Sequence, residues 1–196
     1  RWGRGCHFDP AKNPSIARVM KSAGYRTCVA GKWQINDFRV QPDVLSELGF
    51  DEFCMWTGYE SGVPASGKRY WDPYLFTKDG SKTYADQFGP DVCNQFILDF
   101  IDAHVADEQT REKPFFIYYP MILTHGPLTT TPHQRDAKGT RGRFSAMVEY
   151  MDFLVGNVVK KIDERGLRKN TVIIWTTDNG SPGGISNKRN GGLVRG

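Results

Sequence analysis

The sequence lacks a long hydrophobic run: no stretch approaches the roughly 20 apolar residues that cross a bilayer, which excludes a transmembrane helix. It also lacks any C-x-x-C spacing among its four cysteines, Cys6, Cys28, Cys54 and Cys93. This absence argues against a zinc site or a thioredoxin-like motif. Cys28 and Cys93 lie in apolar segments, where we expect buried free thiols.

Several motifs of common enzyme classes are also missing. The chain contains no G-x-S-x-G elbow, no Walker A loop and no G-x-G-x-x-G fingerprint. The charges are interspersed, and 26 Lys and Arg against 22 Asp and Glu give a net charge of only +4. No stripe of basic and aromatic residues is present, so nucleic acid is not an expected partner.

The composition is that of a folded domain. Of the 196 residues, 39% are hydrophobic and 13% aromatic, which supplies a sizeable core and argues against intrinsic disorder. No linker divides the chain, and we expect residues 1–196 to form a single, partial domain. The chain begins at Arg1 without Met or a signal-like apolar stretch, so we interpret it as the middle of a longer protein.

Three units of helix followed by strand are expected from hydrophobic periodicity and buried apolar runs. The helices are expected at 13–24, 90–106 and 143–165, and the strands at 25–30, 114–120 and 171–176. This alternation predicts an α/β fold with a mostly parallel sheet between helices. Residues 35–88 have no clean period and are expected to hold functional loops and short strands.

The helix ends carry their own signals. Asn13 is expected to cap the first helix, while Gly24 and Gly166 suit the position just after the first and third helices. The last 17 residues, with six glycines, predict either a flexible tail or the start of a loop that closes over a site.

Each predicted strand ends in a short polar segment. These segments are Gly-Lys-Trp-Gln at 31–34, Thr-His-Gly-Pro at 124–127 and Asp-Asn-Gly at 178–180. The carboxyl ends of parallel strands share one edge of a sheet, where open α/β folds bind ligands. We therefore expect the three segments to meet there.

The side chains in these segments suit an anion and a hard cation. Asp178 and Asn179 offer oxygen ligands for Ca²⁺ or Mg²⁺, although Asp-Asn-Gly is also a common tight turn. Lys32 can hold an anionic oxygen, and His125 can donate a proton. The alternatives are an ordinary solvated lysine and a structural histidine, and both remain open.

Taken in order, the segments resemble the sulfatase family, whose fold is alkaline-phosphatase-like. The similarity covers nearly all of residues 13–180. The matching phrases are Ala-Gly-Tyr-Arg-Thr at 23–27, Gly-Lys-Trp at 31–33, Leu-Gly-Phe-Asp-Glu-Phe at 48–53, Lys-Pro-Phe-Phe-Ile-Tyr-Tyr at 113–119, Thr-His-Gly-Pro at 124–127 and Thr-Asp-Asn-Gly at 177–180.

The resemblance implies hydrolysis of sulfate esters, with Ca²⁺ (Mg²⁺ as the alternative) and a formylglycine nucleophile made from Cys or Ser. It implies catalytic and sulfate-binding roles for Lys32 and His125, and a substrate-binding role for Gln34. Asp178 and Asn179 match metal ligands of the family. The expected partner is a sulfated small molecule or glycan, and the expected location is periplasmic or secreted.

The sequence departs from the family at two points. No C/S-x-P/A-x-R motif is present, and we expect it before Arg1 together with the other acidic metal ligands. Gln34 stands where many members have His, and a glutamine cannot shuttle a proton. Residues 1–196 alone are therefore expected to be inactive. The alternatives are a phosphodiesterase or phosphonate hydrolase of the same superfamily, or a non-catalytic anion-binding module.

Overall fold

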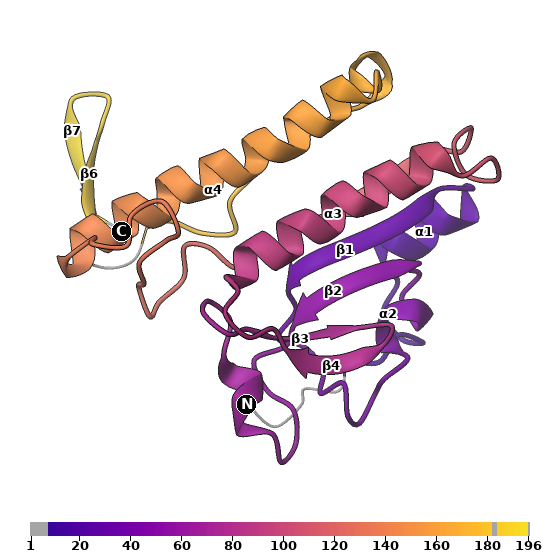
Figure 1. The fold of residues 1–196 in the computed structure, drawn as a ribbon, viewed down its shortest axis with the longest axis horizontal. Helices are drawn as coiled ribbons and strands as arrows, with labels where there is room; N and C mark the ends of the chain where they lie inside the picture. The colour runs from indigo at the N-terminus through magenta and orange to yellow at the C-terminus, as the bar shows by residue number, and fades with distance from the viewer. Residues whose placement is uncertain (1–7, 182–183, 196) are drawn as a thin grey trace.

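The computed structural model describes residues 8–181 and 184–195, in which a five-stranded sheet has the order β4-β3-β2-β1-β5 (Figure 1). Its strands are β1 Arg26–Lys32, β2 Glu52–Trp56, β3 Tyr74–Thr77, β4 Gly80–Thr83 and β5 Phe115–Tyr118. Strand β1 runs parallel to both β2 and β5, whereas the β3–β4 hairpin is antiparallel. The predicted α/β class is confirmed, and the irregular region does contain short strands.

The helices lie close to their predicted positions. They are α1 Ile16–Ser22, α2 Val44–Glu47, α3 Gly89–Ala106 and α4 Gly139–Glu164, with 3₁₀ turns at Pro64–Gly67 (η2) and Arg168–Asn170 (η3). The predicted cap of α1 was wrong, since Ser15 rather than Asn13 caps it by accepting the N–H of Arg18 at 3.1 Å. Asn13 instead donates to the carbonyl of Asp9 at 2.8 Å.

Glycines end two of the helices as predicted. Gly24 has φ +89° directly after the cap residue of α1, and Gly166 has φ +70° directly after that of α4. A residue without Cβ adopts this left-handed conformation at little cost, which lets the chain turn away from the helix axis.

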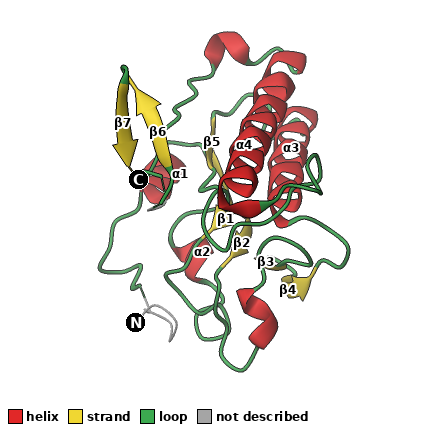
Figure 2. Ribbon diagram, turned by 90° about the vertical axis from the view of Figure 1, so that its left-hand side faces the viewer, coloured by secondary structure: helices red, strands yellow, loops and turns green. Residues whose placement is uncertain are grey.

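The sheet separates two hydrophobic layers. Alternate residues of β1 and β2 face opposite sides, as the pleat requires: Cys28 and Cys54 pack toward α3 and α4, whereas Val29 and Phe53 pack toward α1 and α2. Figure 2 shows α3 and α4 lying side by side over the sheet. Burial of both faces explains the continuous apolar runs of the central strands.

The predicted buried thiols are confirmed for the described residues. Cys28, Cys54 and Cys93 are buried and unpaired, and burial raises the pKa of the Cys28 thiol well above its usual range. Cys6 lies outside the described residues.

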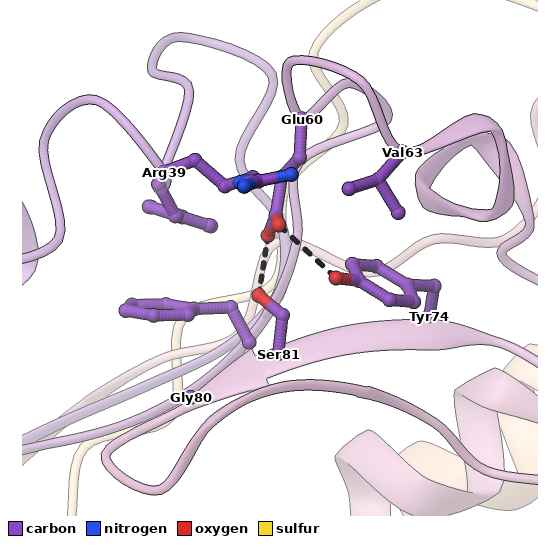
Figure 3. Close-up of a pocket in the computed structure, with 8 residues that line it drawn as sticks. Arg39, Glu60, Val63, Tyr74, Gly80 and Ser81 are labelled. Atoms are coloured by element: carbon purple, nitrogen blue, oxygen red, sulfur yellow. Dashed lines mark hydrogen bonds between the residues drawn. The ribbon is translucent and has the colours of Figure 1, made fainter.

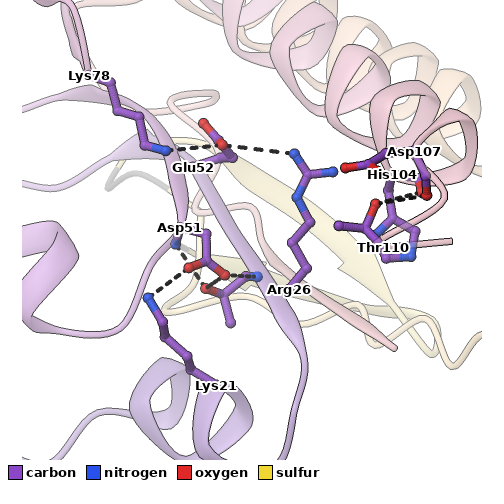
Figure 4. Close-up of polar contacts among 9 residues, drawn as sticks. Lys21, Arg26, Asp51, Glu52, Lys78, His104, Asp107 and Thr110 are labelled. Atoms are coloured by element: carbon purple, nitrogen blue, oxygen red, sulfur yellow. Dashed lines mark hydrogen bonds and ion pairs between the residues drawn. The ribbon is translucent and has the colours of Figure 1, made fainter. Parts of the chain in front are cut away.

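Charged side chains close the amino-terminal end of β1 (Figure 4). The Asp51 carboxylate lies 2.7 Å from the Lys21 ammonium and accepts the backbone N–H of Thr27 at 2.9 Å. Burial alone would raise the pKa of Asp51, but Lys21 and Thr27 together hold it below its ordinary value. Charged pairs thus occupy this end of the sheet, and the predicted ligand-binding edge lies at the other.

The third predicted strand was wrong. Residues 171–176 form no ladder with any described strand, and Val172 and Ile174 are 86% and 83% exposed. Their apolar, β-branched composition favours a strand, but a strand also needs a hydrogen-bonded neighbour. Strand β5 is half-buried at the sheet edge, not fully buried as predicted.

The glycine-rich end forms a hairpin. Strands β6 Ser186–Arg189 and β7 Gly192–Arg195 pair antiparallel and stand apart from the five-stranded sheet in both views (Figures 1 and 2).

Candidate active site

Strands β1 and β5 deliver two of the predicted polar segments to one edge of the sheet. They are parallel neighbours, and the backbone N–H of Lys32 donates to the carbonyl of Pro120 at 2.7 Å, just beyond the end of β5. Strand β1 and the segment after β5 lie very close to each other here. Gly31 has φ +131°, and a Cβ atom on it would lie 2.0 Å from the Pro120 oxygen. Only glycine fits this position.

A cavity of about 460 Å³ opens at this edge, and it brings Gln34 and His125 together. The lining residues are Gln34, Trp56, Gly58, Gly67, Arg69, Tyr70, Trp71, His125 and Pro127. Its volume and its aromatic walls with a few polar groups are typical of small-molecule sites. The cavity therefore marks the candidate active site.

Gln34 reaches the cavity through an uncommon backbone conformation. Its φ is +42°, in the left-handed region that non-glycine residues rarely adopt. Opposite it, a Cβ atom on Gly58 would lie 2.8 Å from the Trp56 ring and 3.1 Å from the Gln34 amide nitrogen. Backbone strain of this kind gathers at functional sites.

The loop that carries His125 is tied to the loop that carries Arg69. The Tyr70 hydroxyl donates to the backbone carbonyl of His125 at 2.5 Å. The Arg69 guanidinium donates to the carbonyl of Gly126, and its Nη2 lies 3.2 Å from Nδ1 of His125. Because Nδ1 of His125 also lies 2.7 Å from the Gly126 oxygen, Nε2 is the ring nitrogen left for a ligand.

The cavity has a cationic wall. Arg69 is only 8% exposed and stacks on the Trp56 ring at 4.7 Å. Burial lowers the pKa of Arg69 from its ordinary value, yet a guanidinium stays charged at neutral pH. Burial also raises the pKa of Tyr70 to about 12, so Tyr70 remains a neutral hydrogen-bond donor. These groups suit an anion.

Lys32 lies at the same edge without lining the cavity. It is half-buried at the last position of β1, opposite Trp56 of β2. No hydrogen bond or ion pair engages its ammonium group within residues 8–181 and 184–195. Its role in holding an anionic oxygen stays a prediction.

Asp178 and Asn179 are not joined to the rest of the site. Both are exposed, and no hydrogen bond or ion pair links them to Lys32, Gln34 or His125 among the described residues. The described part of the chain also holds no cluster of three or more His, Cys, Asp or Glu that fits a metal. A metal site built on this pair therefore stays a prediction.

A second, smaller cavity of about 280 Å³ lies against the β3–β4 hairpin. Figure 3 shows the carboxylate of Glu60 pointing into it between Tyr74 and Ser81, which both donate to it. Glu60 is 2% exposed, and no Lys or Arg among the described residues lies within ion-pair distance. The remaining lone pairs of the Glu60 carboxylate could accept from a hydroxyl donor. The walls of the cavity, however, are largely apolar.

Sequence reasoning missed Arg69 and the aromatic walls of the first cavity. The segment Gly-Lys-Arg-Tyr-Trp at 67–71 lies in the region without hydrophobic periodicity. No strand was predicted there, so no predicted strand end pointed to a site. The available signal was a basic pair between a glycine and two aromatic residues, a composition that suits a binding loop.

The cavity lies at the carboxyl edge of an α/β sheet, where such folds bind ligands, and its cation, imidazole and amide have the chemistry to bind an anion. Residues 6–193 match the sulfatase family, and the chain belongs to that family. The predicted resemblance is thereby confirmed.

Curated relatives include several sulfatases. The chain is 29% identical over 189 residues to N-acetylgalactosamine-6-sulfatase of Mus musculus. The alignment covers 88% of this chain and 34% of that relative. It is 27% identical over 185 residues to human arylsulfatase A, and that alignment covers 87% of this chain and 36% of the relative. The chain thus spans about a third of these relatives.

Solved structures share the fold. The crystal structure of Ps i-CgsB superposes with a TM-score of 0.62 at 20% identity, covering 79% of this chain and 37% of that one. The same protein is also solved in complex with k-i-k-neocarrahexaose.

Within the described residues of the present chain, no helix is both long and apolar enough to cross a membrane.

Proposed function

We propose that residues 1–196 form the central part of a catalytic domain that hydrolyses sulfate esters. The observation that carries the proposal is the cavity at the carboxyl edge of the sheet, which brings Gln34 and His125 together. The family match over residues 6–193 supports it independently. A sulfate ester is a compact anion, and buried donors of fixed orientation are the groups that bind one.

In this proposal Lys32 and His125 act on the sulfate group. The Lys32 ammonium holds sulfate oxygens, because it is a mobile point charge without a partner in the described residues. His125 presents Nε2 to the ester oxygen, since its Nδ1 side is engaged by Gly126 and Arg69. Gln34 binds the substrate as a neutral hydrogen-bond partner, and no proton transfer passes through it.

Asp178 and Asn179 fit a hard divalent cation by the chemistry of their donor atoms. We propose that they hold Ca²⁺, or Mg²⁺, together with ligands from outside this chain. The bound cation would supply positive charge that offsets the charge of the sulfate oxygens. The formylglycine nucleophile is proposed to lie outside this chain as well.

The proposed substrate is a sulfated glycan. Support comes from relatives named for such activities, N-acetylgalactosamine-6-sulfatase and the ulvan-active sulfatase of Formosa agariphila. The aromatic walls of the cavity, Trp56, Tyr70 and Trp71, offer apolar faces to a ring. We further propose that the protein acts in the periplasm or outside the cell, where such polymers occur.

The test compares the full-length protein with residues 1–196 alone. The full-length protein should release sulfate from 4-nitrophenyl sulfate much faster than it releases phosphate from 4-nitrophenyl phosphate, while residues 1–196 alone should release neither. Faster phosphate release would favour a phosphodiesterase-like enzyme. Binding of sulfate esters without turnover by the full-length protein would indicate a binding module, and robust turnover by residues 1–196 would refute the proposal.

A further inference from the structure

The Arg69 side chain is a buried cation without a carboxylate partner. It is 8% exposed, and it forms no ion pair within residues 8–181 and 184–195. Within the described residues its neighbours are the Gly126 carbonyl, the His125 ring, the Trp56 ring and the Tyr70 side chain, none of them a carboxylate. Burying a charge without a counter-ion is costly. An anion arriving in the cavity would offset that cost.

The surroundings hold Arg69 in place before any ligand arrives. Its own carbonyl packs against Gly89 at the start of α3, where a Cβ atom would come within 2.0 Å. The Trp56 ring beneath the guanidinium is fixed by its Nε1–H, which donates to the carbonyl of Ser66 at 3.0 Å. A preorganised cation loses little conformational entropy on binding.

The cavity is larger than a sulfate group requires. Its volume is about 460 Å³, within the range that accommodates a whole small-molecule ligand. Trp56, Tyr70 and Trp71 supply apolar walls for a ring, and Gly67 leaves open space beside Arg69, since a Cβ atom there would contact nothing within 4 Å. A ring held here places its substituents near both His125 and Arg69.

We propose that Arg69, with Trp56, Tyr70 and Trp71, forms a subsite for a second anionic group of the substrate, so that the enzyme prefers glycans with another sulfate or a carboxylate near the sulfate it removes. This inference rests on the proposed function, because it takes His125 to mark the position of the hydrolysed sulfate. Arg69 determines specificity here through a charge-assisted hydrogen bond.

The experiment measures binding to the full-length protein, with Trp56 and Trp71 as fluorescent reporters. The probes are N-acetylgalactosamine 6-sulfate, its 4,6-disulfate, and a disaccharide in which glucuronic acid is joined to N-acetylgalactosamine 6-sulfate. The wild type should bind at least one doubly anionic probe about tenfold or more tighter than the monosulfate, as one added charged hydrogen bond allows. The two doubly anionic probes distinguish a sulfate from a carboxylate.

Substitutions assign the preference to Arg69. Arg69→Met should reduce the affinity ratio to about one to two, and Arg69→Lys should keep part of it, because a charged hydrogen bond accounts for the tenfold effect. Arg135→Met is the matched control, since this exposed arginine stacks on Trp71 at 3.7 Å but does not line the cavity. It should leave the ratio unchanged.

Each outcome decides the question. A wild-type ratio near one, or no binding of any probe, overturns the inference. An equal loss of affinity for mono- and dianionic probes in Arg69→Met also overturns it, because Arg69 would then bind the common sulfate. If Arg69→Met does not fold, the wild-type and Arg69→Lys ratios still decide. Failure of the proposed function has a separate sign, the absence of sulfate release with the binding preference intact.

Discussion

The two halves of the predicted active site differ in how they are held. Gln34 and His125 lie on segments that leave neighbouring parallel strands, and hydrogen bonds from Arg69 and Tyr70 fix the loop of His125. Asp178 and Asn179 follow a segment that pairs with no described strand and is largely exposed.

The difference shows that the placement of the polar segments depends on strand pairing more than on the polar residues themselves. Strands β1 and β5 place their polar segments because a ladder joins them. Residues 171–176 have strand-like composition but no ladder, so nothing directs Asp178 toward the cavity. The cavity around Gln34 and His125 is therefore preorganised by the sheet, whereas no strand ladder among the described residues holds the segment that carries Asp178 and Asn179.

The largest expected contrast is between two isoleucines. In α3, Ile97 is fully buried, whereas Ile174 is 83% exposed. Ile97→Ala should lower the free energy of unfolding by about 2–5 kcal/mol, and Ile174→Ala should change it by less than about 0.5 kcal/mol. Urea unfolding of the two variants measures both. Similar losses would mean that residues 171–176 are buried in the protein after all.

Substitutions of two glycines test the same difference between the paired strands and the exposed segment. Gly31→Ala places a Cβ atom against the Pro120 carbonyl at an unfavourable φ, and it should cost about 2–4 kcal/mol through strain and overpacking. Gly180→Ala meets nothing within 4 Å and should be nearly neutral. Thermal unfolding compares the variants. A neutral Gly31→Ala would contradict the close approach of β1 to the segment after β5.

The site residues should affect rate without affecting stability. In the full-length protein, Lys32→Ala and His125→Ala should each lower kcat/KM for a sulfate ester by about 10²-fold or more, as lost transition-state contacts do. Lys169→Ala is the control, because this exposed lysine lies in η3 and should leave kcat/KM unchanged. Near-normal kinetics for Lys32→Ala and His125→Ala would remove both residues from the site.

The smallest expected effect is a pH dependence at the opposite end of the sheet. Since Lys21 and Thr27 hold the pKa of Asp51 below its ordinary value, this carboxylate stabilises the fold above about pH 4, and the contribution disappears as pH falls through the lowered pKa. Asp51→Asn should therefore cost about 1 kcal/mol or less at pH 7 and progressively less in acid.

Urea unfolding at a series of pH values measures that difference. A gap between Asp51→Asn and the wild type that widens in acid would contradict the assigned sign.

Hydrophobic periodicity was sufficient to predict the helices and strands whose apolar faces pack against the core. The helix signals for α3 and α4 and the apolar runs of β1 and β5 predicted those elements closely. It failed at residues 171–176, because composition reports burial preference and not the presence of a pairing partner. Ser15 caps α1 in place of Asn13 because the helix begins at Ile16, so Asn13 lies too far upstream to reach its first N–H groups.

For the site, strand ends predicted Gln34 and His125, but Arg69 could not be found that way. Arg69 reaches the cavity from a loop after η2, and its position depends on packing against Trp56 and Gly89, both distant in sequence. Contacts of that kind arise only when the chain is folded, so the position of a strand end in the sequence does not predict them. Whether Asp178 and Asn179 bind a metal stays a prediction.

Among the described residues, strand β5 pairs on one side only, and its Tyr118 is 48% exposed. A row of unpaired backbone donors and acceptors is a template for intermolecular pairing. Recombinant residues 1–196 should therefore self-associate as concentration rises, so dilute samples and short storage would suit biophysical work on the isolated polypeptide.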